Sequence, residues 1–172
     1  KAHSIPNPTT AYGFVLAANR VVDRNRIRLV DAIPTPLPIP DGSTAGISRT
    51  FNVSQTGTIR HVRAYVYVSH PDRNDIWVTL TKGSTSVNLE TGINGITSGR
   101  ADIIGIFPDT RNYDEDVTAF VGQNSQGTWT LTVSDRDADG RVGTLRHLAL
   151  EFELEVPNQA PVVSLTADPS AL

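Results

Sequence analysis

The sequence predicts an all-β protein, an antiparallel β-sandwich or jelly roll with a short N-terminal extension. Apolar and polar residues alternate in several short segments, as they do in half-buried strands. Turn-forming residues separate these segments, and no convincing helix follows residue 41. Many short strands without helices are typical of two-layer β folds.

The predicted strands follow one another from residue 51 onward. Each is recognised by a row of apolar residues at every second position, and residues 69–74 between two of them form a turn by composition. Residues 92–116 are expected to form long loops around one short strand. The inward rows are Phe51 and Val53; Val62, Ala64, Val66 and Val68; Ile76, Val78 and Leu80; Val87 and Leu89; Trp129, Leu131 and Val133; and Leu148, Leu150, Phe152, Leu154 and Val156.

Both ends of the chain differ from this pattern. Residues 14–22 could form a short helix after the capping pair Thr9 and Thr10. Residues 34–40 carry four prolines at alternate positions, which predicts an extended connector. We therefore predict an N-terminal segment and linker over residues 1–38, a sandwich over 39–156, and a linker with the start of a further β module over 157–172.

Composition narrows the function classes. The chain has 172 residues and no cysteine, which excludes disulfides, thiol chemistry and thiolate metal sites. Its net charge of −3 argues against a nucleic-acid surface. No apolar run approaches the ~20 residues of a membrane helix. Because the chain contains no methionine, we expect it to be a piece of a longer protein.

Acidic residues gather in the second half of the chain. Residues 101–140 contain eight acidic residues and two arginines. Within the sequence DRDADG, Asp135, Asp137 and Asp139 occupy every second position, and closely spaced carboxylates repel one another unless solvent or a cation separates them. Calcium binds six to eight oxygen ligands, so this turn is a candidate calcium loop. Arg146 stands where an EF-hand needs a glutamate, which excludes a true EF-hand.

A second candidate calcium site combines Asp75 with Asp72, Asn74 and Asp109, provided that their two loops share one end of the sandwich. The alternatives are that the acidic loops are a solvated surface and that Asp75 accepts backbone amides in its own turn. The sequence leaves these alternatives open.

Catalytic motifs are absent from the sequence. The four histidines lie in neither a nucleophile-elbow motif nor a zinc-binding His-Glu-x-x-His motif. His61 and His147 fall on predicted strands, and His70 precedes a proline in a turn that its ring can hold by hydrogen bonds. We predict that this chain has no catalytic residues.

Three segments together resemble the P domain, or homo-B domain, of kexin- and furin-like proprotein convertases and bacterial secreted subtilisin-like proteases. The first contains IPDGS and the strand VYVSHPDRNDIWVTL, with His70, Asp75 and Ile76 at the positions of the motif. The second is IFPDTRNYDEDVTAFVGQNSQGTW, and the third is GTWTLTVSDRDADGRVGTL. The resemblance covers about residues 39–155. It departs from the family at His147, where we expect a tryptophan, and in its acidic D-x-D-x-D-G turn.

The resemblance implies a non-catalytic module of a secreted bacterial protease. Such a module is expected to stabilise, regulate or calcium-tune the adjoining catalytic domain of the same polypeptide and to help position a protein substrate. We also expect the chain to bind calcium through its acidic residues and to be monomeric. Residues 11–22 are similar to the end of a subtilisin-like catalytic domain, and residues 158–161 resemble the start of an immunoglobulin-like or PKD module.

Three alternatives remain open. The parent could be a secreted zinc metalloprotease, because P domains also follow those enzymes. The chain could instead be a sugar- or surface-binding jelly roll, if Tyr65, Tyr67 and Trp77 are exposed on one sheet face. It could also be a structural spacer in an adhesin.

Overall fold

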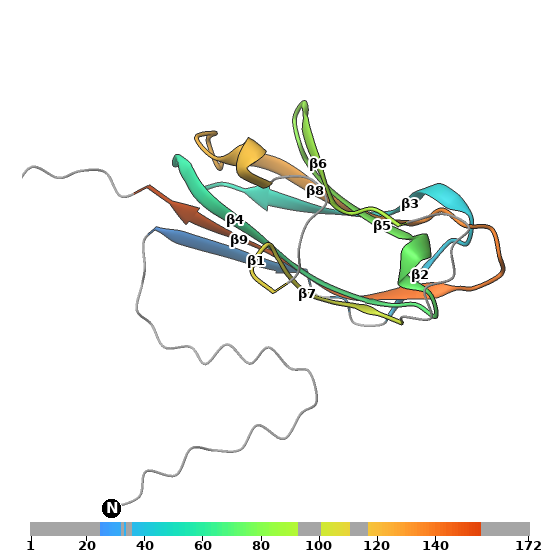
Figure 1. The fold of residues 1–172 in the computed structure, drawn as a ribbon. Coiled ribbons are helices and arrows are strands. Elements are labelled where there is room, and N and C mark those ends of the chain that lie inside the picture. The colour runs from blue at the N-terminus through green and yellow to red at the C-terminus, as the bar shows by residue number, and fades with distance from the viewer. Residues whose placement is uncertain (1–24, 32, 34–35, 93–100, 111–116, 156–172) are drawn as a thin grey trace, which may run out of the picture.

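The computed structural model describes residues 25–31, 33, 36–92, 101–110 and 117–155. They form two antiparallel sheets packed face to face (Figure 1), which confirms the predicted all-β sandwich. Two short 3-10 helices, η1 (Arg73–Asp75) and η2 (Val117–Phe120), lie in the connections. Neither is long or apolar enough to span a bilayer. Sheet A contains β1 (Arg26–Asp31), β2 (Leu37–Ile39), β4 (Ile59–Ser69), β7 (Ile103–Phe107) and β9 (Gly143–Leu154); sheet B contains β3 (Ser43–Val53), β5 (Ile76–Lys82), β6 (Thr85–Glu90) and β8 (Gly127–Asp135).

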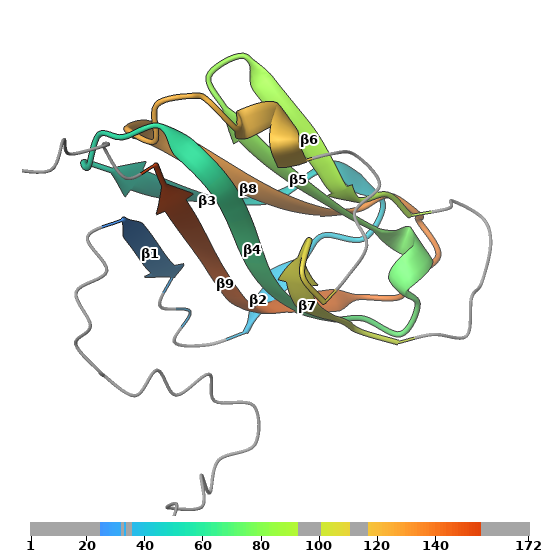
Figure 2. The same cartoon turned by 60° about the vertical axis from the view of Figure 1, so that its left-hand side comes forward.

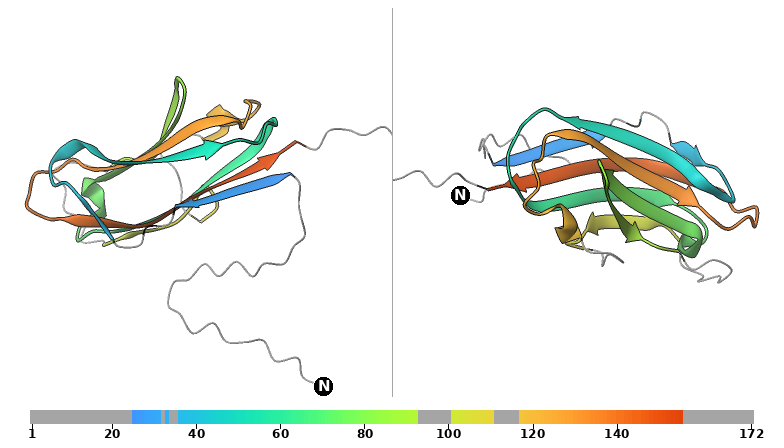
Figure 3. Two further views of the ribbon diagram at one scale, coloured as in Figure 1. Left: turned by 180° about the vertical axis from the view of Figure 1, so that it is seen from behind. Right: turned by 90° about the horizontal axis from the view of Figure 1, so that it is seen from above.

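The core lies between the two layers, which Figure 3 shows from behind and from above. The inward rows predicted from residue 51 to Leu154 are all buried, whereas Val156 lies outside the described residues. Trp129 is fully buried, with its ring centroid 4.9 Å from that of Phe120 and 4.6 Å from that of Phe152. Its indole N–H donates to the carbonyl oxygen of Ser125 at 2.9 Å, which satisfies the polar atom that tryptophan brings into a core.

The sandwich begins before the predicted boundary at residue 39. β1 pairs with β9 from Arg26 opposite Glu153 to Asp31 opposite Leu148, and β2 pairs with the same strand. Figure 2 shows β1 beside β9 at the edge of sheet A. The arginines of β1 do not prevent strand pairing, because they lie on its outer face opposite the glutamates of β9. The predicted helix at residues 14–22 and the predicted module after residue 156 lie outside the described residues.

Charged and aromatic residues cover one part of the outer face of sheet A. The Arg28 guanidinium lies 4.4 Å from the centroid of the Tyr65 ring. Glu151 lies on this outer face of β9, yet it is only 5% exposed. It accepts hydrogen bonds from the Tyr65 hydroxyl and from Arg63, each at 3.3 Å. His147 of β9 lies opposite Tyr67 of β4. Burial is the main cause that lowers the pKa of His147.

Among the connections whose residues the structure describes, three cross from one sheet to the other at the same end of the sandwich. β4 leads through η1 into β5, β8 leads through the acidic loop into β9, and β2 leads into β3. The register fixes this arrangement, because Asp135 lies opposite both Ile76 and Ser43 in sheet B. In sheet A, Gly143 and Thr144 lie opposite Ile39 and Ser69, respectively. This end of the molecule therefore gathers polar residues that are far apart in the sequence.

Candidate metal centre

His70 lies at the centre of this end, directly after β4, and is 2% exposed. Its Nε2 atom lies 3.1 Å from Asp135 Oδ2 and 3.2 Å from the carbonyl oxygen of Arg141. Nδ1 contacts the backbone of Asp72, whose amide N lies 3.0 Å away. The ring thus holds the turn after β4 against the loop after β8, which agrees with the structural role predicted for His70.

Close packing leaves no spare room around the imidazole. A Cβ atom placed on Gly143 would lie 2.6 Å from His70 Cδ2, so only glycine fits beside the ring. Asp102 holds the backbone of His70 in place as well. The His70 amide donates to Asp102 Oδ1, and the His70 carbonyl oxygen accepts from the Asp102 amide, each at 3.0 Å.

Asp72 and Asp75 bring two further carboxylates into the interior. Both are 1% exposed. Asp72 caps η1, since its Oδ1 accepts from the amide of Asn74 at 3.0 Å. Asp75 is the last residue of η1, and its Oδ2 lies 3.8 Å from Nδ1 of His70. This oxygen is buried and has no hydrogen-bond partner among the described residues.

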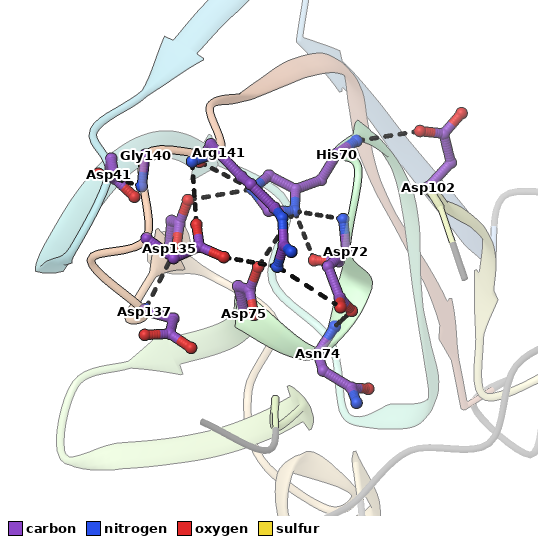
Figure 4. A network of polar contacts seen from close by, with 11 residues as sticks. Asp41, His70, Asp72, Asn74, Asp75, Asp102, Asp135, Asp137, Gly140 and Arg141 are labelled. Carbon is purple, nitrogen blue, oxygen red and sulfur yellow. Dashed lines mark hydrogen bonds and ion pairs between the residues drawn. The ribbon is translucent and has the colours of Figure 1, made fainter. Parts of the chain in front are cut away.

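The acidic loop after β8 contributes its aspartates unequally. Asp135 is fully buried and points inward, and its Oδ1 also accepts from the amide of Asp137 at 3.3 Å. Asp139 is exposed at the loop tip and pairs with Arg141, with 2.5 Å between Oδ2 and Nη1. Figure 4 shows the side chains of Asp135, Arg141, Asp72 and Asp75 gathered around one small region beside His70. The predicted loop of three neighbouring carboxylates is therefore split, with Asp135 turned toward η1.

The electrostatics of this region are unfavourable to a further negative charge. Burial is the largest cause that raises the pKa of Asp75 to about 6, and the charges of Asp72, Asp139 and Asp135 raise it further, while His70 opposes them. Burial likewise raises the pKa of Asp135, against the lowering effect of His70.

The donor atoms fit a calcium ion better than a softer metal. Among the described residues, His70, Asp75 and Asp135 each offer one ligand atom within 4.8 Å of the other two. Both ring nitrogens of His70 already take part in hydrogen bonds, to Asp135 and to the backbone of Asp72, so neither is free to bind a metal. The imidazole instead holds these two aspartates in position. The unpartnered oxygen of Asp75 and the neighbouring carboxylates of Asp72 and Asp135 are hard oxygen donors of the kind calcium takes. Sequence reasoning from acidic residues alone missed His70 as a member of this cluster, although the P-domain motif includes it.

Asp109 does not join this group, contrary to the expectation that its loop and the turn at Asp72 share one end. β7 runs antiparallel to β4, so the residue before β7 (Asp102) lies beside His70, and Asp109 follows the opposite end of β7. Asp109 instead accepts a hydrogen bond from Arg63 Nε and lies 3.4 Å from His61 Nε2. The hydrogen bond from Arg63 is the largest cause that lowers its pKa.

The aromatic platform for sugar binding is also not formed. Tyr65 and Tyr67 lie on β4 of sheet A, whereas Trp77 lies on β5 of sheet B. Tyr65 is only 7% exposed, and the Arg136 guanidinium lies 3.8 Å from the centroid of the Trp77 ring. The three rings therefore share no face.

Comparison with known proteins decides the family. Residues 59–152, more than half of the chain, match the family described as the proprotein convertase P-domain. The chain belongs to this family. Two curated relatives, each named calcium-dependent protease, come from Trichormus variabilis and a Nostoc species. Each is 30% identical over 120 residues, which cover 67% of this chain and 17% of the relative.

Solved structures agree on the fold. The serine protease of Aeromonas sobria superposes with a TM-score of 0.52 at 18% identity, covering 76% of this chain and 26% of that protein. The structure of the same protease in complex with a chaperone gives a TM-score of 0.51 at the same identity and coverage. The P domain is a non-catalytic domain of proteases, and this chain spans about a sixth of the length of its curated relatives.

Proposed function

We propose that this chain is the non-catalytic P domain of a secreted bacterial protease, a subtilisin-like serine endopeptidase. In this proposal, the domain stabilises or regulates the adjoining catalytic domain of the same polypeptide and binds calcium at its acidic end. The family match supports the attachment to a protease, and the names of the two curated relatives support calcium.

The single observation that carries the calcium proposal is the buried Asp75 Oδ2, which has no hydrogen-bond partner among the described residues. A buried carboxylate oxygen without a partner costs several kcal/mol unless it is neutralised or bound. Asp72 and Asp135 lie beside it and supply further oxygens. Asp137 and Asp139, in the loop above, are the predicted ligands that would approach from the solvent side.

In this proposal the ion contributes stability. Extracellular calcium modules have dissociation constants of roughly 0.1–1 mM. A tenfold excess of free calcium over such a constant raises the free energy of unfolding by about 1.4 kcal/mol. For a domain whose total stability is ~5–15 kcal/mol, this is a substantial share.

The test is thermal unfolding of the 172-residue chain in EGTA and in about 10 mM calcium, a tenfold excess over the upper end of this range, with magnesium as the ion control. The wild type should gain several degrees in calcium alone, because one kcal/mol moves the midpoint of a domain of this size by a few degrees. Asp75→Asn should remove the gain. Asp109→Asn is the matched control, since it removes an aspartate that the structure places elsewhere, and it should keep the gain. Equal midpoints of the wild type in EGTA and in calcium would refute the calcium proposal.

A further inference from the structure

We propose that Arg141 occupies the cation position of the acidic cluster as a resident counter-charge, so that calcium must displace its guanidinium in order to bind. This inference rests on the proposed calcium site and assigns the residue that sets its affinity. Arg141 would then keep the domain folded at low calcium and weaken binding at the same time.

Arg141 reaches into the cluster from the loop between β8 and β9. Its Nη1 lies 2.5 Å from Asp139 Oδ2 and 3.9 Å from Asp72 Oδ2. Its backbone amide donates to Asp139 Oδ1 at 2.9 Å. In Figure 4 the guanidinium lies among the carboxylates of η1 and of the loop. One side chain therefore connects the exposed carboxylate of Asp139 in the loop with the buried carboxylate of Asp72, which caps η1.

The Arg141 guanidinium neutralises only part of the negative charge of the cluster. The cluster contains four carboxylates, and those of Asp72, Asp139 and Asp135 all act on that of Asp75. Arg141 contacts two of them and Nε2 of His70 contacts a third, while Asp75 Oδ2 has no hydrogen-bond partner in the described part of the chain. A monovalent group that is fixed to the loop cannot satisfy this oxygen, whereas a divalent ion can contact several carboxylates at once.

The Arg141 guanidinium has more freedom to move than the buried carboxylate of Asp72. The Arg141 side chain is 39% exposed, but that of Asp72 is 1% exposed and tied to the backbone by its capping bond. The guanidinium can therefore turn into solvent while the buried carboxylates stay in place. A calcium ion and a guanidinium within a few ångströms of each other repel, so the cluster holds one or the other.

The charge at position 141 should accordingly control calcium affinity. Calcium binds more weakly to a site from which a positive group must first be expelled, because the free-energy cost of the expulsion opposes binding. Removing the charge should tighten binding by about tenfold or more at low ionic strength, and salt should reduce the difference.

Isothermal titration with calcium chloride tests this inference on the wild-type chain, Arg141→Gln, Arg141→Lys and Arg136→Gln. Arg136 is a matched control, because it is an arginine of the same loop whose side chain lies over Trp77 and donates to Ser134. We expect Arg141→Gln to bind calcium about tenfold more tightly, and Arg141→Lys and Arg136→Gln to bind like the wild type. Thermal unfolding in EGTA should show Arg141→Gln less stable than the wild type, with a larger gain in calcium. Calcium-dependent folding of this variant would be the extreme form of the same result.

The outcomes separate this inference from the proposal on which it rests. If the wild type binds calcium and Arg141→Gln binds it equally or more weakly, Arg141 does not compete and the inference is wrong. An equal gain in affinity for Arg141→Gln and Arg136→Gln would also overturn it, because general charge would then explain the effect. If neither the wild type nor Arg141→Gln binds calcium, the proposed calcium site itself fails.

Discussion

Replacing Asp75 by asparagine should remove a large part of the pH dependence of unfolding when divalent cations are absent. The folded structure raises the pKa of this carboxyl from 3.8 to about 6, chiefly because Asp75 is buried and its neighbours Asp72, Asp139 and Asp135 are acidic. An asparagine of the same size carries no charge at any pH.

The sign and the size follow from this pKa. A carboxyl whose pKa is higher in the folded state contributes stability below its unfolded pKa and loses that contribution as the pH rises through the folded pKa. The loss therefore falls between about pH 4 and pH 6. The difference between 3.8 and about 6 corresponds to about 3 kcal/mol of unfolding free energy. Because Asp75 is 1% exposed, solvent does little to reduce this effect.

The assay is urea unfolding of the wild type and Asp75→Asn in EGTA at several values from pH 4 to pH 8. The two free energies should be similar near pH 4, and the variant should be more stable at pH 8 by about 3 kcal/mol. Other groups also titrate, but they are present in both proteins, so the difference between the curves isolates Asp75. Parallel curves for the two proteins, or a variant that is less stable at pH 8, would refute the reasoning.

Three further substitutions test other parts of the structure. Gly143→Ala should lower the free energy of unfolding in urea by about 1–3 kcal/mol, since its Cβ would meet the His70 ring; an unchanged value would contradict this packing. Trp129→Phe should cost about 2 kcal/mol in the same assay, because it leaves a buried carbonyl without its donor, and a neutral result would count against that bond. Asp109→Asn should be less stable than the wild type at pH 7 and equal to it near pH 2, because the pKa of Asp109 is lowered by its arginine partner and the contribution is lost as the pH falls; a difference that persists at pH 2 would rule out this ion pair as its source.

The strands of the sandwich could be predicted because alternation with a period of two reports directly which side chains face the core. The rows of β4, β5, β8 and β9 are buried as expected. β1 was missed, although Ile27 and Leu29 alternate there with arginines. Its edge position and its pairing with the glutamates of β9 are properties of the whole sheet, and no short window of sequence contains them.

The acidic residues could be predicted as ligands one by one, but their grouping could not. Whether Asp102 or Asp109 lies beside His70 depends on the direction of β7 relative to β4, which the sequence does not specify. The same holds for Asp135, whose side chain turns inward because the register of β8 places it opposite Ile76, next to η1. The role of Arg141 likewise appears only when the loop and η1 are seen together.

The most direct test of the proposed calcium site is a crystal structure of this chain grown in calcium, with the ion located by its anomalous scattering. We expect a peak about 2.3–2.6 Å from Asp75 Oδ2, with the Arg141 guanidinium turned away from Asp72. A structure in which no ion contacts Asp75, or in which calcium binds only Asp137 and Asp139 while Arg141 stays in place, would contradict it.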